Sequence, residues 1–158
     1  MNNTFTSYLD GLTPKGKNIA REAVAVYLRG LQEEKVQIKT SEDIYNQCRD
    51  LSMLNIEHFD ILLLNQAFRL IKRVNISCGG IDNTTVDVRL IMKHCVLNDA
   101  TVLACVHNHP SGSLKPSTDD KHITSVIKKA GELLNIRLLD HVIIGDDKYH
   151  SFYDNGEL

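Results

Sequence analysis

Residues 100–120 read ATVLACVHNHPSGSLKPSTDD, and this stretch decides the fold class that the sequence predicts. Residues 100–106 have the length and the apolar composition of a buried strand. His107 and His109 follow two residues apart, so both side chains are expected on the same side of that strand. Pro110 cannot extend a β-ladder and Gly112 permits a tight turn, which predicts that the chain leaves the sheet there. Two imidazoles therefore stand together at the end of a strand.

The residues after this turn predict the start of a helix. Ser117 and Asp120 are three residues apart, which is the spacing of a capping box, where each side chain bonds the other's backbone. Behind them, apolar residues recur at helical spacing: Ile123, Val126, Ile127, Ala130, Leu133 and Leu134. This pattern places Asp120 in the first turn of a helix, near the two histidines.

Two imidazole nitrogens and one carboxylate oxygen form a ligand set that catalytic zinc sites use, with the fourth tetrahedral position left for water. We therefore expect His107, His109 and Asp120 to bind Zn²⁺, although other divalent ions tolerate the same ligands, and we expect that water to be the nucleophile. Two alternatives stay open. Ser117 and Asp120 could form only a helix cap, although capping and ligation are compatible. Cys105 shares the strand face of His107 and could be a fourth ligand or a small buried hydrophobe.

Short sequence motifs that include these residues and their neighbours resemble those of a known family. His107-x-His109-Pro110, then six residues, then Ser117-x-x-Asp120 matches the JAMM motif of the JAB/MPN metallopeptidases. The strings HNHPSG from His107 and LLDHVIIGD from Leu138 resemble the RadC branch of that family, and the resemblance extends from about Ile38 to Phe152. It implies the JAB/MPN (cytidine-deaminase-like) fold, an α/β fold with a mixed sheet and flanking helices.

The resemblance also implies an activity, the zinc-dependent hydrolysis of peptide or isopeptide bonds in a peptide or protein substrate. In it, His107, His109 and Asp120 are the metal ligands and Ser117 helps to hold the oxyanion. The family further needs an upstream glutamate as general base. Glu57 is the best match, because the word Glu57-His58-Phe59 immediately precedes a strand-like run. Without the resemblance, Glu57 would be interpreted as a solvated residue at a helix–strand junction.

Two other classes of function are weighed against the enzyme. One is a metal-stabilised binding module, since JAB/MPN-type domains also occur as non-catalytic scaffolds, but scaffold versions typically lose the complete His, His, Asp set that is present here. A DNA-associated, DNA repair-type role would follow the RadC name. The 18 basic residues are interleaved with 20 acidic ones and the net charge is −2, which does not support broad binding to nucleic acid, while a local basic patch stays open.

The composition indicates an ordinary globular protein in the cytoplasm. The chain has 158 residues, 42% of them hydrophobic and 24% charged, which is enough to build a core. The first ten residues are polar, no window has membrane-spanning length, and no membrane partner is expected. The four cysteines lie far apart, as expected for reduced thiols. The sequence names neither the substrate nor the oligomeric state.

Hydrophobic periodicity predicts the element order ααββαβαββ, which is a mixed α/β layer fold. The expected helices cover about residues 15–34, 41–54 with Ser41 as cap, 86–97, and a stretch that begins at 117. The expected strands cover about residues 58–64, 70–77, 100–106, 137–144 and 149–153. RadC-like proteins usually carry an N-terminal helix-hairpin-helix region, and no matching word appears in residues 1–37. We divide the chain into an N-terminal helical segment, residues 1–37, and a RadC-like JAB/MPN domain, residues 38–158.

Asp140 and His141 fall within the strand predicted at residues 137–144. We expect both to be structural or to support the metal ligands, because a ligating histidine commonly donates its free N–H to a nearby group. Asn108 faces away from its two histidine neighbours and is expected to bond backbone.

Overall fold

The structure is a computed structural model that describes residues 11–31, 36–79 and 86–158. It divides into two compact units, residues 1–35 and residues 36–158. The described part of the first unit is helix α2, Pro14–Leu31, where Thr13 caps the first turn by accepting a hydrogen bond from the backbone N–H of Gly16. The predicted end of this helix near Glu34 lies outside the described residues. None of the described helices has the length and apolar content that a membrane crossing requires.

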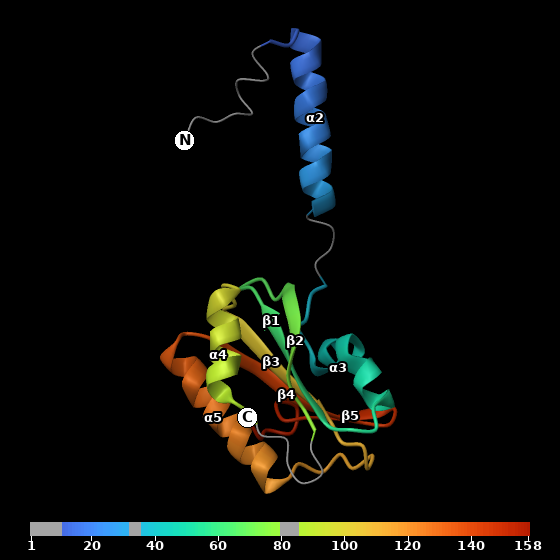
Figure 1. Ribbon diagram of the computed structural model, residues 1–158, viewed down its shortest axis with the longest axis vertical. Coiled ribbons are helices and arrows are strands. Elements are labelled where there is room, and N and C mark those ends of the chain that lie inside the picture. Colours follow the sequence, from blue (N-terminus) through green and yellow to red (C-terminus); the bar gives the residue numbers. More distant parts are fainter. Residues whose placement is uncertain (1–10, 32–35, 80–85) are drawn as a thin grey trace. The chain divides into compact units, whose positions relative to one another are not determined.

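The second unit is built on a mixed five-stranded sheet in the order β2-β1-β3-β4-β5 (Figure 1). Its strands are β1 His58–Leu64, β2 Leu70–Cys78, β3 Val102–Asn108, β4 Arg137–Gly145 and β5 Lys148–Ser151. Strands β3 and β4 run parallel, and the other neighbouring pairs run antiparallel. The mixed α/β fold predicted from the sequence is confirmed.

Strand β3 lies at the centre of this sheet, and all seven of its residues are buried. A strand that is buried on both faces can be apolar at every position rather than alternating, which explains the continuous run at residues 102–106. The sequence predicted that the strand ends at residue 106, before His107. It ends at Asn108, so His107 lies inside the strand. The end of β3 is therefore held on both sides, by β1 and by β4.

Helices cover both faces of the sheet (Figure 1). Helix α3, Ser41–Cys48, and the short 3₁₀ helix η1, Arg49–Met53, pack on one face, and helices α4, Val88–Leu97, and α5, Thr118–Leu133, pack on the other. Alternate residues of a strand supply the two cores, for example Leu62 to the α3 side and Ile61 to the α5 side. The inward face predicted for α4 is confirmed, because Ile91, Met92 and Cys95 are buried.

The predicted second helix is wrong in its cap and in its length. Thr40 is the cap: its hydroxyl accepts from the Asp43 N–H, and the Asp43 carboxylate accepts from the Thr40 N–H. Ser41 is the first helical residue instead, and its hydroxyl donates to Asp154. The α-helix ends at Cys48 and continues as η1.

Smaller differences concern two other elements. Helix α4 begins at Val88, because the side chain of Asp87 caps it by accepting from the backbone N–H of Arg89. Strand β5 ends at Ser151, two residues before the predicted end. Tyr153 leaves the ladder because its N–H donates to the Asp140 side chain at 2.9 Å.

Candidate metal centre

The end of β3 and the start of α5 bring three side chains together, and we call His107, His109 and Asp120 the metal triad. The two histidine Nε2 atoms are 3.0 Å apart. Asp120 Oδ1 lies 3.2 Å from His107 Nε2, and Asp120 Oδ2 lies 3.6 Å from His109 Nε2. His109 stands just past the strand, where its N–H still bonds the carbonyl of Ile144. The three residues that the sequence singled out as ligands thus converge.

The spacing of these atoms fits a small tetrahedral cation. Ligand atoms at about 2.0–2.1 Å from zinc lie roughly 3.3 Å from one another. Two separations in the metal triad are near that value: 3.0 Å between the two Nε2 atoms and 3.2 Å between His107 Nε2 and Asp120 Oδ1. Within residues 11–31, 36–79 and 86–158, no other group of three His, Cys, Asp or Glu side chains is placed to share an ion. The metal triad is therefore arranged so that its three residues could hold one metal ion.

The hydrogen bonds of His109 show why a cation suits this site. His109 Nδ1 lies 2.7 Å from the carbonyl oxygen of Ser113, which can only accept, so Nδ1 carries a proton. The neutral ring then has a bare Nε2, which points at the Asp120 carboxylate. The hydrogen bond with Asp120 raises the pKa of His109, burial opposes this, and Ser113 and the charge of Glu57 add to it. A proton or a metal ion would satisfy the facing lone pairs.

The carboxylate of Asp120 is ready to act as an anionic ligand. Burial raises its pKa, but the hydrogen bonds that His107 and His109 donate when they are protonated at Nε2 outweigh burial and hold the pKa well below its usual range. The side chain of His107 is only 1% exposed, whereas those of His109 and Asp120 are 16% and 13% exposed. The metal triad is thus closed toward the core and open on one side toward solvent.

Ser117 caps α5 and also orients the carboxylate of Asp120. Its Oγ accepts from the Asp120 N–H at 3.0 Å and donates to Asp120 Oδ2 at 2.7 Å, and its own N–H donates to the same oxygen. The predicted capping box is confirmed. Because these bonds occupy Oδ2, the other oxygen, Oδ1, is left for a ligand role. Capping and ligation are therefore compatible in this helix.

Glu57 lies immediately before β1 and is half-buried. Phe59 pairs with His107 across β1 and β3, so Glu57 comes to the end of the sheet where the metal triad lies. Asn108 fixes this segment: its Oδ1 accepts from the N–H of His58 at 2.8 Å, and its Nδ2 donates to the carbonyl of Ile56 at 3.0 Å. The backbone-bonding role expected for Asn108 is confirmed, and both neighbours of Glu57 are held by it.

Cys105, which the sequence offered as a fourth ligand, lies outside the site. Cys105 is fully buried in the core on the α5 side of the sheet, and burial raises the pKa of its thiol. It does not belong to the group of side chains that could share an ion. The structure supports its reading as a small buried hydrophobe.

His141 lies directly behind His107. Its Nε2 is 2.8 Å from His107 Nδ1, and its ring stacks on Phe152 with the centroids 4.9 Å apart. Burial lowers its pKa well below the ordinary value, so the ring is neutral. Thr124, at 2.6 Å from His141 Nδ1, was missed in the sequence, although it stands four residues after Asp120 on the same helix face.

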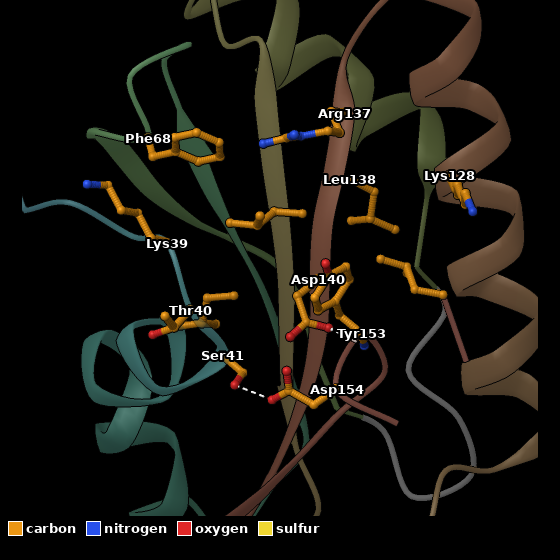
Figure 2. A pocket seen from close by; sticks show the side chains of 13 residues that line it. Lys39, Thr40, Ser41, Phe68, Lys128, Arg137, Leu138, Asp140, Tyr153 and Asp154 are labelled. Carbon is orange, nitrogen blue, oxygen red and sulfur yellow. Dashed lines mark hydrogen bonds between the residues drawn. The ribbon is translucent and has the colours of Figure 1, made fainter. Parts of the chain in front are cut away.

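A cavity of about 700 Å³ lies away from the metal triad, along β4 (Figure 2). Phe68 and Arg137 stand at one end of it, with the guanidinium 4.8 Å from the ring centroid, and Ser41 and Asp154 are bonded at the other end. Asp140 lines the cavity, and its carboxylate accepts from Ser151 Oγ and from two backbone N–H groups. Since no member of the metal triad lines this cavity, it is not part of the candidate centre.

Comparison with known proteins shows which family this chain belongs to. Residues 38–157 match the family described as RadC-like JAB domain. A UPF0758 protein of Flavobacterium johnsoniae is 46% identical over 121 residues, which are 76% of this chain and 53% of that protein. A UPF0758 protein of Porphyromonas gingivalis is 47% identical over 109 residues, 68% of this chain and 48% of that protein. One of Clostridioides difficile is 39% identical over 122 residues, 77% and 52% of the two chains.

The chain spans about half the length of these curated relatives. The matched region contains the whole sheet and every residue of the metal triad. With its mixed sheet, its flanking helices and its His-x-His and Ser-x-x-Asp residues converging at the end of β3, this chain belongs to the RadC-like JAB domain family.

Proposed function

We propose that this protein is a zinc-dependent hydrolase of peptide or isopeptide bonds. The observation that carries the proposal is the convergence of two imidazole nitrogens and one carboxylate group at 3.0 to 3.6 Å, open to solvent on one side. Membership of a JAB-type family, which is associated with metal-dependent hydrolysis, supports it. Zinc held there would supply a Lewis acid that polarises a carbonyl and lowers the pKa of a water molecule.

Glu57 is the general base in this proposal. It accepts a proton from the attacking water and delivers it to the leaving amine. Its support is positional: Asn108, between the two histidines of the metal triad, bonds the backbone on either side of Glu57. The charge of Glu57 also acts on His109. A carboxylate held in this way is near the ligands without being one of them.

Ser117 is proposed to stabilise the oxyanion that forms when water attacks the carbonyl. Its hydroxyl proton points at Asp120 Oδ2 in the structure, at 2.7 Å. A rotation about the Cβ–Oγ bond of Ser117 would turn that proton toward a substrate oxygen and leave Oγ in place. Two further hydrogen bonds between Ser117 and Asp120 would keep the helix capped during this rotation.

The substrate is proposed to be an extended peptide segment or a flexible tail. The mouth of the site lies beside His109 and Asp120, which are the exposed members of the metal triad. Strand β3 cannot itself pair with a substrate strand, because β1 and β4 occupy both its sides. A substrate that adds a strand would have to use β2 or β5, the two ends of the sheet order.

The test is peptide cleavage by the zinc-loaded protein, read by mass spectrometry on a peptide library. Glu57→Gln should keep its zinc and lose at least about 100-fold in hydrolysis rate. Glu132→Gln, an exposed glutamate of α5, is the matched control and should cleave like the wild type. Full activity in Glu57→Gln would show that another group is the base. Zinc binding without cleavage of any peptide would favour the metal-stabilised binding module.

A further inference from the structure

Behind the metal triad, a chain of hydrogen bonds connects the backbone of one ligand to the ring of another. Thr124 Oγ1 lies 2.5 Å from the Asp120 carbonyl oxygen and 2.6 Å from His141 Nδ1. His141 Nε2 lies 2.8 Å from His107 Nδ1. The three residues that contribute side chains to these hydrogen bonds are buried: Thr124 is 3% exposed, His141 0% and His107 1%. Water therefore does not compete for these hydrogen bonds.

The carbonyl group of Asp120, at one end of this series of hydrogen bonds, fixes the direction of every bond in it. A carbonyl oxygen can only accept, so the single proton of the Thr124 hydroxyl is donated to Asp120. The hydroxyl must then accept from His141 Nδ1, which carries a proton. A neutral ring protonated at Nδ1 has a bare Nε2, which accepts from His107 Nδ1–H. The neutral His107 ring in turn has its bare nitrogen at Nε2, the atom that faces His109 and Asp120.

The surroundings of His141 favour its neutral form. Phe152 stacks on one side of its ring and Phe59 approaches edge-on with the centroids 5.4 Å apart. The two ring nitrogens bond His107 and Thr124, and within residues 11–31, 36–79 and 86–158 no carboxylate is hydrogen-bonded to them. A charged imidazole without a partner is costly in such a place. Asp140 accepts from the backbone N–H of His141 and holds the strand, not the ring.

We propose that Thr124 and His141 are positioning residues that hold His107 in its Nδ1–H tautomer, so that the Nε2 lone pair is presented to the metal. The inference rests on the metal site of the proposed function, but not on the reaction. A ligating histidine is more often held by a carboxylate or a carbonyl, which can only accept. An imidazole can also donate, so His141 alone does not choose the tautomer of His107. Thr124 makes that choice, because its proton is committed to Asp120.

The first test is the ¹⁵N spectrum of the imidazole groups in the metal-free protein at alkaline pH, where the rings are neutral. We expect His107 and His141 both to be protonated at Nδ1. An Nε2–H signal for His107 in the wild type would overturn the proposal. This measurement needs neither metal nor substrate, so its outcome is independent of whether the protein is a zinc hydrolase.

The second test compares Thr124→Val with Thr124→Ser. Valine keeps the shape of threonine but removes the hydroxyl, so we expect mixed tautomers at His107 and roughly 10- to 100-fold weaker zinc binding in competition with a chelator. Serine restores the hydroxyl and should restore both signals. Ile127→Val, which removes one buried methyl group from the same helix, is the control and should change neither. Wild-type tautomers and zinc affinity in Thr124→Val would overturn the proposal.

Discussion

Two polar clusters lie on opposite faces of the same sheet, and they differ in whether their polar atoms are satisfied. On the α3 side is the arginine cluster, which we define as Asp50, Asp60, Arg73 and Asn75. Arg73 donates to Asp60 at 2.6 Å, to both oxygens of Asp50 and to a backbone carbonyl, and Asn75 donates to the second oxygen of Asp60. On the α5 side is the metal triad, whose bare nitrogens face a carboxylate.

This difference separates a structural cluster from the proposed metal site. The arginine cluster uses four of the five N–H donors of its guanidinium and both oxygens of its buried carboxylate within the protein, so its charges are already paired. The metal triad is held from behind by satisfied bonds and is unsatisfied only at the atoms that face one another. We therefore expect a cation to bind at the cluster that is open in one direction.

The largest effect is expected from removing the nitrogens of the metal triad. Wild-type protein supplied with zinc should carry about one zinc ion per chain, and the double variant His107→Ala, His109→Ala should carry none, because one carboxylate is too few ligands. Elemental analysis of the two purified proteins measures this. Zinc at wild-type stoichiometry in the double variant would place the site elsewhere.

The second effect tests the opposite cluster. Arg73→Met leaves the buried Asp60 carboxylate without its cation, so we expect a loss of about 3 kcal/mol in the free energy of unfolding and unchanged zinc content. Urea denaturation and elemental analysis provide the two readings. Arg89→Met removes an arginine from an exposed pair with Asp87 and should change stability little. Zinc loss in Arg73→Met would mean that the two clusters are coupled.

The third effect compares two capping boxes, one at the metal triad and one at α3. Ser117→Ala and Thr40→Ala should each lower the free energy of unfolding by about 1 kcal/mol, because each removes a helix cap. Only Ser117→Ala should also weaken zinc binding, roughly tenfold, since only Ser117 orients a proposed ligand. Equal zinc affinities for the two variants would reduce Ser117 to a cap.

The smallest effect is a pH dependence in the arginine cluster. The hydrogen bond from Arg73 lowers the pKa of Asp50, so the ionised carboxylate stabilises the folded state above its ordinary pKa of about 3.9. That stability is lost as the pH falls through the lowered, folded-state value. The Asp50 side chain is 64% exposed, so the advantage over Asp50→Asn at neutral pH should stay below about 1 kcal/mol.

Urea denaturation at neutral pH and in acid measures the difference between wild type and Asp50→Asn. We expect the two proteins to converge in stability in acid. A difference that grows as the pH falls would contradict the sign of this linkage. Zinc binding at neutral pH should be the same in both proteins, because Asp50 lies on the other face of the sheet.

Local patterns predicted the elements that carry the chemistry well. Strand β1 was predicted with its observed bounds, and the cap of α5 at Ser117 is confirmed. These features depend on residues a few positions apart, so the sequence contains the whole signal. The cap of α3 was misplaced by one residue, because Thr40 and Ser41 are both good caps and only the position of Asp43 distinguishes them. The arginine cluster was missed because its members come from η1, β1 and β2.

The sequence by itself determined which side chains can bind a metal and how they are spaced along β3 and α5. Only the tertiary structure decided that His141, 34 residues after His107, stands behind it with Thr124. The same holds for Glu57, whose neighbour His58 is bonded by Asn108 at the end of β3, 50 residues further along the chain. The reason is physical: spacing along a strand or helix is fixed by local backbone geometry, whereas the register between strands is fixed by the packing of the whole sheet.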